Sequence, residues 1–265
     1  MSGTPHHTHT HTHEESGVVH HHSHSHDPSA HSHHAPGDIK EANRQYFDSQ
    51  AHHHSEGYEA SPARQLATRK AVAAILDTVQ FDEDKTVVMD YACGTGLLSQ
   101  GLAPHTKTLI GVDISPKSVD YYNERVANQG IPPEEMNAIC LDLVERGTGE
   151  ADPFNGIEFD VIVCAQAYHH FEDINSVTKV LTSYLKPGTG VLVVVDMIRS
   201  SESEKLHKDH GHVVTHKGGF EEDSIRSAFV DAAGLLNYTF KPAFQMGWQE
   251  RHVDIFIATG VRAAT

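Results

Sequence analysis

The chain has 265 residues, 38% of them hydrophobic, and a formal net charge of −16 at pH 7. This length can bury one sizeable core, and one folded domain with a tail fits it better than two small domains. The acidic balance argues against a nucleic-acid partner, because phosphate binding needs clustered Lys and Arg. The sequence shows neither a long apolar run nor a charged-then-apolar leader, so we expect no membrane span and a cytoplasmic protein, with the nucleus as the alternative.

Residues 1–37 form a His-rich head of low complexity. The head reads HHTHTHTHEES, HHHSHSH and HSHH between Gly, Pro and Ser residues. With almost no apolar side chains to bury, it cannot offset the entropy lost on ordering, so we expect disorder. Alternating imidazoles favour Zn, Ni or Cu. The head therefore predicts weak binding of a divalent metal, and a merely solvated tail is the alternative.

Residues 38–60 differ from the head because charged and aromatic residues return. Tyr46 and Phe47 stand at helical spacing from Ile39. Residues 52–54, three histidines, either line a substrate mouth or continue the composition of the head. We expect 38–60 to be an N-terminal lid segment.

A core helix is predicted to begin after residue 60. Ser61 is a suitable N-cap, and Pro62 fits the first turn. An apolar stripe follows at helical spacing. Its members are Leu66, Val72, Ala73, Ile75, Leu76 and Val79.

The segment TVVMDYACGTGLLSQ, residues 86–100, predicts a strand, a glycine turn and a helix. Gly94 and Gly96 lack the Cβ atoms that would hold a ligand away from the backbone. The helix that starts at Leu97 offers unpaired N–H groups at its N-terminus. A dinucleotide fingerprint needs a third glycine where this chain has Ser99. The turn therefore favours a nucleotide cofactor and weakens a dehydrogenase interpretation.

Strands and helices are predicted to alternate through the rest of the chain. This alternation is typical of a parallel sheet with helices on both faces. The expected strands are 108–112, 136–141, 159–165, 190–197, 236–240 and 253–259, and the expected helices are 116–128, 173–185 and 221–233.

Polar residues follow several of these strands, at the sheet edge where ligands of open α/β folds bind. Asp113 can accept hydrogen bonds from two hydroxyl groups, or it can cap the helix that starts near Pro116. Asp142 is either a ligand contact or a turn residue. His169 and His170 are candidate general bases for a hydroxyl or thiol acceptor. For each histidine the alternative is a side chain that bonds the backbone and packs under a helix.

The series DxxCGTG, LIGVDIS and LDL resembles the class I S-adenosylmethionine-dependent methyltransferases, from about Ala42 to Thr259. The resemblance implies an α/β, Rossmann-like fold: a seven-stranded, mostly parallel sheet with helices on both faces and an antiparallel last strand. It also implies that 61–265 is the methyltransferase domain. The segment CAQAYHHF is similar to the fourth motif of small-molecule members, and it lacks the Asn-Pro-Pro-aromatic motif of nucleic-acid members.

The resemblance implies a role for each motif residue around S-adenosyl-L-methionine. Asp90, Gly94 and Gly96 would surround the methionine part of the cofactor. Asp113 would accept hydrogen bonds from the ribose hydroxyls. Ile114 would pack on the adenine, and Asp142 with Leu143 would meet the adenine edge. The expected cofactor-binding residues are Asp90, Cys93, Gly94, Thr95, Gly96, Asp113, Ile114, Asp142, Leu143 and Gln166.

Two further groups of residues bear on metal and redox chemistry. The three scattered cysteines suit reduced thiols rather than a disulfide framework. His210, His212 and His216 have ligand-like spacing, although a substrate pocket or a solvated turn is the alternative. We conclude that the sequence predicts a methyltransferase acting on a small molecule by in-line methyl transfer. The alternatives are a protein methyltransferase and a metal-binding regulatory protein with an inactive fold.

Overall fold

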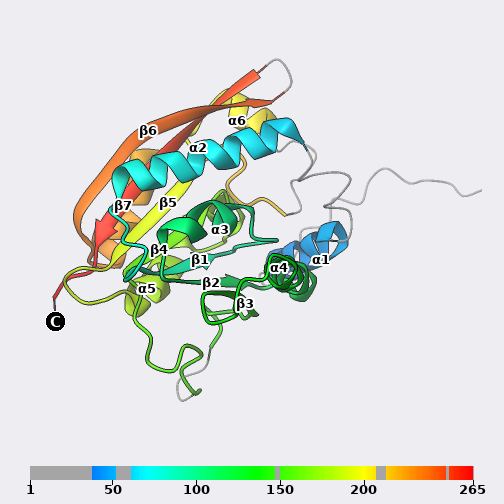
Figure 1. Cartoon of the computed structure of the whole chain (residues 1–265). Coiled ribbons are helices and arrows are strands. Elements are labelled where there is room, and N and C mark those ends of the chain that lie inside the picture. Colours follow the sequence, from blue (N-terminus) through cyan, green and yellow to red (C-terminus); the bar gives the residue numbers. More distant parts are fainter. Residues whose placement is uncertain (1–37, 52–60, 147–149, 207–212, 249–250, 265) are drawn as a thin grey trace, which may run out of the picture. The chain divides into compact units, whose positions relative to one another are not determined.

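The computed structural model describes residues 38–51, 61–146, 150–206, 213–248 and 251–264. Helices and strands alternate along these residues (Figure 1). In chain order they are α1 (Asp38–Ala51), α2 (Pro62–Thr78), β1 (Val87–Tyr91), α3 (Leu97–Leu102), η1 (Ala103–His105), β2 (Thr108–Asp113), α4 (Pro116–Asn128), β3 (Met136–Cys140), β4 (Val161–Ala165), η2 (Tyr168–His170), α5 (Ile174–Tyr184), β5 (Val191–Met197), α6 (Ser201–Leu206), α7 (Glu222–Arg226), η3 (Ser227–Ala232), β6 (Leu236–Trp248) and β7 (Arg251–Val261).

The seven strands form one sheet in the order β3-β2-β1-β4-β5-β7-β6. The first five pair in parallel, whereas β7 is antiparallel to both β5 and β6. The predicted fold class is thereby confirmed. The strand order reverses between β1 and β4, and the carboxyl ends of these strands diverge there to leave a crevice.

Two hydrophobic cores, one on each face of the sheet, follow from the alternation of side chains along the strands. In β1, Met89 belongs to one core and Val88 to the other. Helix α5 contributes Leu181 to the first core, and α2 contributes Ile75 to the second. Because the central strands are buried on both faces, they are almost continuously apolar.

The buried face of α2 differs from the predicted apolar stripe. Ala67, Ala71 and Ile75 are buried, whereas Leu66 is 47% exposed and Ala73 is also exposed. The reason is close packing of α2 against α3, where a Cβ atom on Gly101 would lie 2.6 Å from Val72 Cγ2. Only small side chains allow the two helices to approach this closely, so alanines occupy the buried face of α2.

The last two strands are longer than the sequence predicts. The prediction ended the first of them at Phe240, but β6 continues to Trp248 and pairs with β7 along its length. Pro242 lies next to a register shift and on an edge strand, where its missing N–H costs little pairing. The extended part carries Met246 and Gly247 to the crevice.

Smaller differences concern element ends. Strand β1 continues through Asp90 to Tyr91 instead of ending at the acid. The helix predicted for 221–233 is α7 followed by the π-helical turn η3. Among the described residues, no helix has both the length and the apolar character needed to span a membrane.

Candidate functional site

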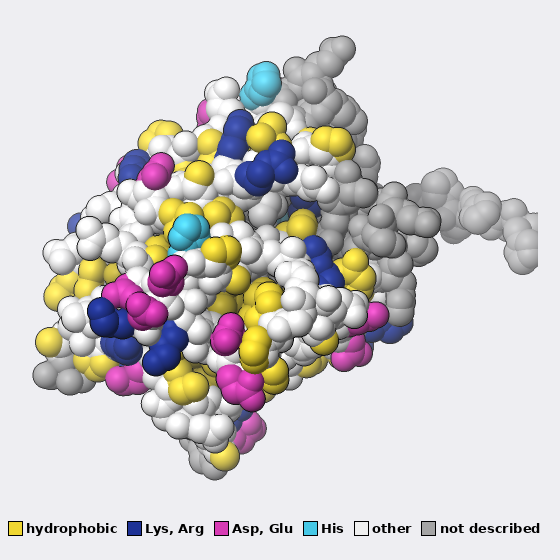
Figure 2. Space-filling model, in the orientation of Figure 1, with side chains coloured by type: hydrophobic (Ala, Val, Ile, Leu, Met, Phe, Trp, Pro, Cys, Tyr) yellow, Lys and Arg dark blue, Asp and Glu magenta, His cyan; other side chains and the backbone are white. Residues whose placement is uncertain are grey.

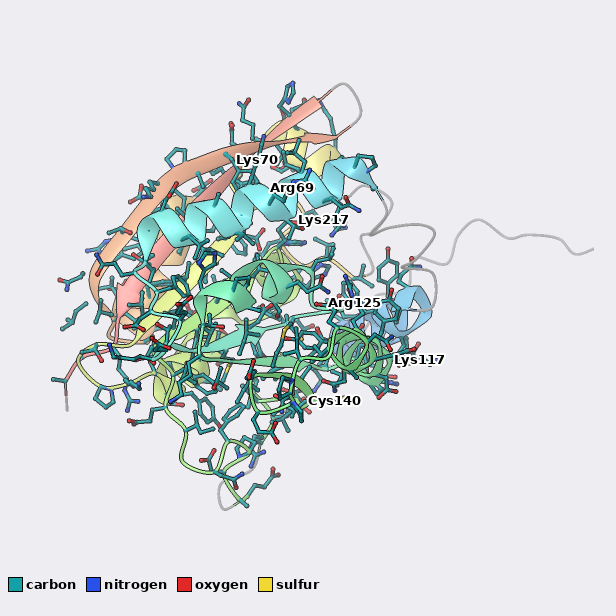
Figure 3. All side chains as sticks on the ribbon, in the orientation of Figure 1. Arg69, Lys70, Lys117, Arg125, Cys140 and Lys217 are labelled. Carbon is teal, nitrogen blue, oxygen red and sulfur yellow. The ribbon has the colours of Figure 1, made fainter. Side chains whose placement is uncertain are left out.

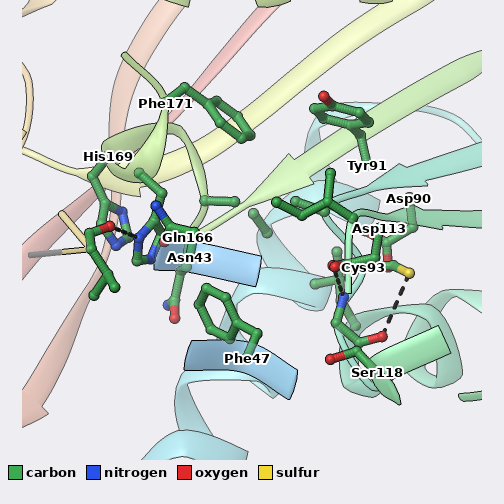
Figure 4. A pocket seen from close by; sticks show the side chains of 18 of the residues that line it. Asn43, Phe47, Asp90, Tyr91, Cys93, Asp113, Ser118, Gln166, His169 and Phe171 are labelled. Carbon is green, nitrogen blue, oxygen red and sulfur yellow. Dashed lines mark hydrogen bonds between the residues drawn. The ribbon is translucent and has the colours of Figure 1, made fainter. Parts of the chain in front are cut away.

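A cavity of about 820 Å³ lies at the carboxyl ends of β1, β2, β4 and β5. Each of these strands contributes a residue at or near its end: Tyr91, Asp113, Ala165 and Met197. In Figure 4, Asp113 and Cys93 lie at one side of the cavity and Gln166 and His169 at the other. The volume is in the upper part of the range of small-molecule sites, about 300 to 1,000 Å³.

The two glycines of the turn after β1 have different roles. Gly94 has a φ of +53°, and a Cβ atom built on it meets nothing within 4 Å. Gly96 has a φ of +86°, and its Cβ would lie 2.5 Å from the Tyr122 ring. Gly94 therefore leaves bare backbone at the cavity, whereas Gly96 permits packing of α3 against α4. Gly96 is not among the residues that line the cavity, contrary to the prediction.

Asp113 at the end of β2 is fixed by backbone hydrogen bonds. Its Oδ2 accepts from Gly94 N and its Oδ1 from Ser115 N, both at 2.8 Å. Ser115 itself caps α4 by accepting from Ser118 N, so the alternative of Asp113 as the helix cap is wrong. Each carboxylate oxygen retains a further acceptor position, which suits the hydroxyl groups of a ribose.

Asp90 is buried behind the turn, with 2% of its surface exposed. Its Oδ2 accepts a 2.6 Å hydrogen bond from Ser99 Oγ. Burial, together with the charge of Asp113, raises the pKa of Asp90 to about 7 although the Ser99 hydroxyl opposes the shift. The residue that replaces the third glycine of a dinucleotide fingerprint thus holds the strand-end acid.

Of the residues predicted to contact the adenine, two line the cavity and one lies in the hydrophobic core. Ile114 and Asp142 line the cavity, and Asp142 forms an ion pair of 2.9 Å with Lys40 of α1. Leu143 does not line it: the side chain is only 3% exposed and belongs to the core beneath β1 and β4. Cys140, the exposed thiol labelled in Figure 3, lies beside Ile114 with Sγ 3.7 Å from the Ile114 carbonyl oxygen.

Helix α1 is held against the β2–α4 connection. Asp48 accepts a 2.6 Å hydrogen bond from Ser115 Oγ and a 3.3 Å bond from the backbone N of Lys117, a residue labelled on α4 in Figure 3. Phe47, one residue earlier, lines the cavity and meets the His170 ring edge-on at 5.4 Å. Helix α1 therefore contacts both sides of the cavity. The lid predicted for 38–60 remains a proposal, because the rest of that segment, with its three histidines, lies outside the described residues.

Two non-glycine residues with left-handed backbone follow the central strands. Ala92 after β1 has a φ of +58° and Gln166 after β4 has a φ of +54°, and both line the cavity. Gln166 was predicted from its position, but Ala92 was not. Such conformations cost about 1 to 3 kcal/mol and cluster at functional sites.

The adjacent histidines of η2 both line the cavity but bond to different groups. His169 is 6% exposed, and its Nδ1 lies 2.9 Å from Asp196 Oδ1. His170 donates from Nδ1 to the Val213 carbonyl oxygen at 2.6 Å. The sequence prediction missed Asp196, although a charged residue inside the apolar run VVVDM indicates a buried partner.

The end of the cavity near these histidines is apolar. Residues from β5, α6, the segment before α7 and the β6 extension surround it, and we call this group the apolar end: Met197, Leu206, Val213, Val214 and Met246. The cavity thus joins a polar end at Asp113 to an apolar end at His169.

Metal ligands do not gather in the part of the chain that the structure describes, since no group of three His, Cys, Asp or Glu residues is placed to hold an ion there. His216 has its Nε2 buried without a hydrogen-bond partner among the described residues. Its two predicted companions at 210 and 212 lie outside the described residues, as does the His-rich head.

Comparison with known proteins agrees with this geometry. Residues 89–191, which include the glycine turn and the His pair, match the family described as a methyltransferase domain. An uncharacterized methyltransferase of Schizosaccharomyces pombe is 41% identical over 150 residues, which are 55% of this chain and 52% of that protein. A sterol 4-C-methyltransferase of Caenorhabditis elegans is 28% identical over 48% of this chain and 36% of that protein. By these matches the chain is similar to methyltransferases, over residues 89–191 and over the 150 residues aligned with the Schizosaccharomyces pombe protein.

Solved methyltransferase structures share the fold at low sequence identity. Magnesium protoporphyrin IX methyltransferase from Synechocystis with bound S-adenosylhomocysteine superposes with a TM-score of 0.60 and 18% identity, covering 85% of this chain and all of that chain. Geranyl diphosphate C-methyltransferase from Streptomyces coelicolor gives a TM-score of 0.62 and 11% identity, covering 89% of this chain and 100% of that chain. This chain spans about half, or less, of the two curated relatives named above.

The fold brings most predicted site residues together. Those that line the cavity are Asp90, Cys93, Gly94, Thr95, Asp113, Ile114, Asp142, Gln166, His169 and His170. Gly96 and Leu143 are displaced from it for the packing reasons given above. Asp48, Phe47 and Met246 join the site from elements distant in sequence, which no local pattern indicates.

Proposed function

We propose that this protein is an S-adenosylmethionine-dependent methyltransferase that acts on a small-molecule acceptor. One observation carries the proposal: a single cavity joins the bare backbone at Gly94 and the acceptor oxygens of Asp113 to the apolar end beside His169. The first part fits a nucleoside cofactor and the second part fits a separate acceptor. The similarity to a sterol 4-C-methyltransferase and the fold shared with magnesium protoporphyrin IX methyltransferase support a small acceptor.

The residues at the polar end would each hold one part of the cofactor. Asp113 would accept hydrogen bonds from the ribose hydroxyls, and Ile114 and Asp142 would contact the adenine. Gly94 would let the methionine part lie against the backbone, close to Asp90, whose pKa is raised by burial. When bound, S-adenosylmethionine supplies a methyl group on a sulfonium centre.

The contribution of the protein to such a reaction is mainly positional. Holding an acceptor atom in line with the methyl group can contribute about 7 to 11 kcal/mol in favourable cases. The strained residues that follow the two central strands, Ala92 after β1 and Gln166 after β4, would fix the two halves of the cavity in one geometry. Helix α1 would cover the bound molecules and exclude water, because it contacts both sides of the cavity.

Ligand protection tests the cofactor assignment. We expect S-adenosylhomocysteine to raise the melting temperature of the full chain and NAD to leave it unchanged, because protection follows binding to the folded state. Transfer of label from methyl-tritiated S-adenosylmethionine is then measured with apolar small molecules and with Lys- or Arg-containing peptides. Protection by NAD alone would remove the cofactor assignment, and labelling of peptides alone would favour the protein-methyltransferase alternative.

A further inference from the structure

Asp196 and His169 form a buried pair at the apolar end of the cavity. His169 Nδ1 lies 2.9 Å from Oδ1 and 3.1 Å from Oδ2 of Asp196, and the backbone N of His169 donates to Oδ2 at 3.2 Å. Met197 N donates to Oδ1 at 2.7 Å. The carboxylate is fully buried. Two backbone donors and one ring nitrogen therefore hold Asp196 in a single orientation.

The carboxylate decides which ring nitrogen of His169 carries a proton. Burial raises the pKa of Asp196, but a protonated His169 ring and the hydrogen bonds from that ring, from Met197 N and from His169 N lower it overall. The two backbone N–H groups donate to this carboxylate whether or not the ring is charged, so the carboxylate faces Nδ1 as an acceptor. Nδ1 therefore carries a hydrogen in both forms of the ring, and the neutral ring has its lone pair on Nε2. A carboxylate in this position also stabilises the imidazolium that forms when Nε2 takes up a proton.

The neighbouring histidine bonds to a different kind of group among the described residues. His170 Nδ1 donates to the neutral carbonyl of Val213, and its ring packs edge-on against Phe47. A carbonyl orients the ring but contributes no full charge to stabilise an imidazolium. Of the two candidate bases, His169 is the one that the surroundings equip for proton transfer, and His170 matches the alternative of a ring that bonds the backbone.

We propose that His169 is the general base for methylation of an acidic hydroxyl group on an apolar molecule, and that Asp196 is its positioning residue. The inference rests on the proposed function and deepens it. The apolar end supplies the surroundings for the body of the acceptor, while His169 is the titratable side chain of η2 that lines the same space and holds a charged partner. An acceptor without a dissociable proton would not use this pair.

The step balances without another reactant. His169 Nε2 takes the hydroxyl proton, and a lone pair of the oxygen forms the new bond to the methyl carbon. The carbon–sulfur bond breaks with its electron pair on sulfur, which becomes a neutral thioether. The imidazolium then releases its proton to water. The titratable side chains close to His169 are Asp196 on β5, His170 in the same turn and His216 from the segment before α7.

Nitrogen NMR of the histidine rings tests the tautomer in the complex of the full chain with S-adenosylhomocysteine. The His169 signal is identified by its loss in His169→Gln, and exposed His105 serves as the reference ring. We expect the Nδ1–H form for His169 in the wild type. In Asp196→Asn the amide nitrogen can face Nδ1 and force the Nε2–H form. An Nε2–H wild type, or an unchanged tautomer in Asp196→Asn, would overturn the positioning role.

A pair of matched acceptors tests the reaction class. para-Heptylphenol loses a proton on methylation, whereas para-heptyl-N,N-dimethylaniline does not. We expect methyl transfer to the phenol only, with turnover lowered roughly 10²- to 10⁴-fold in His169→Gln and in Asp196→Asn, and less than about tenfold in His170→Asn. S-Adenosylhomocysteine affinity should stay within about twofold in Asp196→Asn.

The outcomes separate this inference from the proposed function. Wild-type protein that does not bind S-adenosylhomocysteine defeats both. Binding with transfer to the aniline, or with transfer to neither probe, defeats the hydroxyl class while the methyltransferase assignment stands. Equal loss in the His169 and His170 variants defeats the choice of base.

Discussion

Asp90 and Asp113 stand near the ends of neighbouring strands, but their carboxylates meet different surroundings. Asp113 accepts backbone hydrogen bonds from Gly94 and Ser115, whereas Asp90 is buried and bonds to Ser99. Gly94 lies between them in the chain, with open space where a side chain would project. At the residue scale, the polar end of the cavity therefore depends on the absence of a Cβ atom at Gly94 and on two acids with different hydrogen-bond partners.

Gly94→Ala should separate backbone strain from loss of the cofactor site. A left-handed φ costs a non-glycine residue roughly 1 to 2 kcal/mol of folding free energy. Gly130 is a matched control, because its φ is +72° and a Cβ there also meets nothing within 4 Å, but it does not line the cavity. We expect similar stability losses in Gly94→Ala and Gly130→Ala, and weaker S-adenosylhomocysteine binding in Gly94→Ala only. Calorimetric titration measures the S-adenosylhomocysteine affinity. Equal affinities in the two variants would contradict the role of Gly94.

The raised pKa of Asp90 predicts a stability that depends on pH. In the folded state its pKa is about 7, against an ordinary value of 3.8, so between these values the folded chain binds more protons than the unfolded chain. Stability should therefore fall as pH rises from about 4 to about 7 and level off above that. Relative to Asp90→Asn, we expect a loss of roughly 2 to 4 kcal/mol across this window. Urea unfolding of both proteins at several pH values measures the difference, and parallel curves would refute the prediction.

At the element scale, α1 and the β6 extension, which are not part of the five parallel strands, supply further walls of the cavity. Helix α1 is joined to the β2–α4 connection through Asp48, and the extension brings in Met246 beside Gln166, whose Nε2 lies 3.9 Å from the Met246 sulfur. Helix α2 lies along this extension, where Lys70 Nζ donates to the Gln245 carbonyl. On the face shown in Figure 2, Lys and Arg stand in separate groups among acidic and apolar side chains.

Asp48→Ala should loosen α1 without unfolding the sheet. The change removes the hydrogen bonds to Ser115 Oγ and Lys117 N and the ion pair with Arg44. We expect faster hydrogen exchange over residues 38–51 and S-adenosylhomocysteine affinity reduced by roughly five- to thirtyfold. Gln45→Ala is the matched control on the same helix, because Gln45 is exposed and, among the described residues, its side chain bonds Glu41 at 2.7 Å. Equal exchange rates in both variants would show that Asp48 does not anchor α1.

At the scale of the whole molecule, the described residues place cofactor and acceptor regions within one unit, residues 35–265. The described residues that form the cavity, the sheet and both cores belong to this unit. The division of the chain into a His-rich head, a lid and a methyltransferase domain remains a proposal. Under this division, cofactor binding by residues 38–265 and metal binding by the His-rich head are independent properties.

Removal of residues 1–37 should therefore leave the fold of residues 38–265 intact. We expect the chain that starts at Asp38 to keep its melting temperature and to bind S-adenosylhomocysteine within about twofold of the full chain. Zinc uptake should fall sharply, because the alternating imidazoles are the ligands proposed to hold the metal. Calorimetric titration with zinc compares the two proteins, and equal uptake would end the proposal for the head.

The sequence alone determined the features that depend on neighbouring residues. Strand and helix order, the turn at Gly94, the helix that starts at Pro116 and the place of Asp113 followed from periodicity, capping and turn chemistry, which act over a few residues. The resemblance of the motifs to a known family then predicted the fold class, which the sheet order confirmed.

Only the tertiary structure decided which distant residues meet. Asp196 reaches His169 across 27 positions and Asp48 reaches Ser115 across 67, because adjacent strands and a crossing helix bring them together. Packing against Tyr122 excluded Gly96 from the cavity, and core packing turned Leu143 inward. Such pairings depend on sheet register and on the shape of the neighbouring surface, and local sequence preferences carry no information about either.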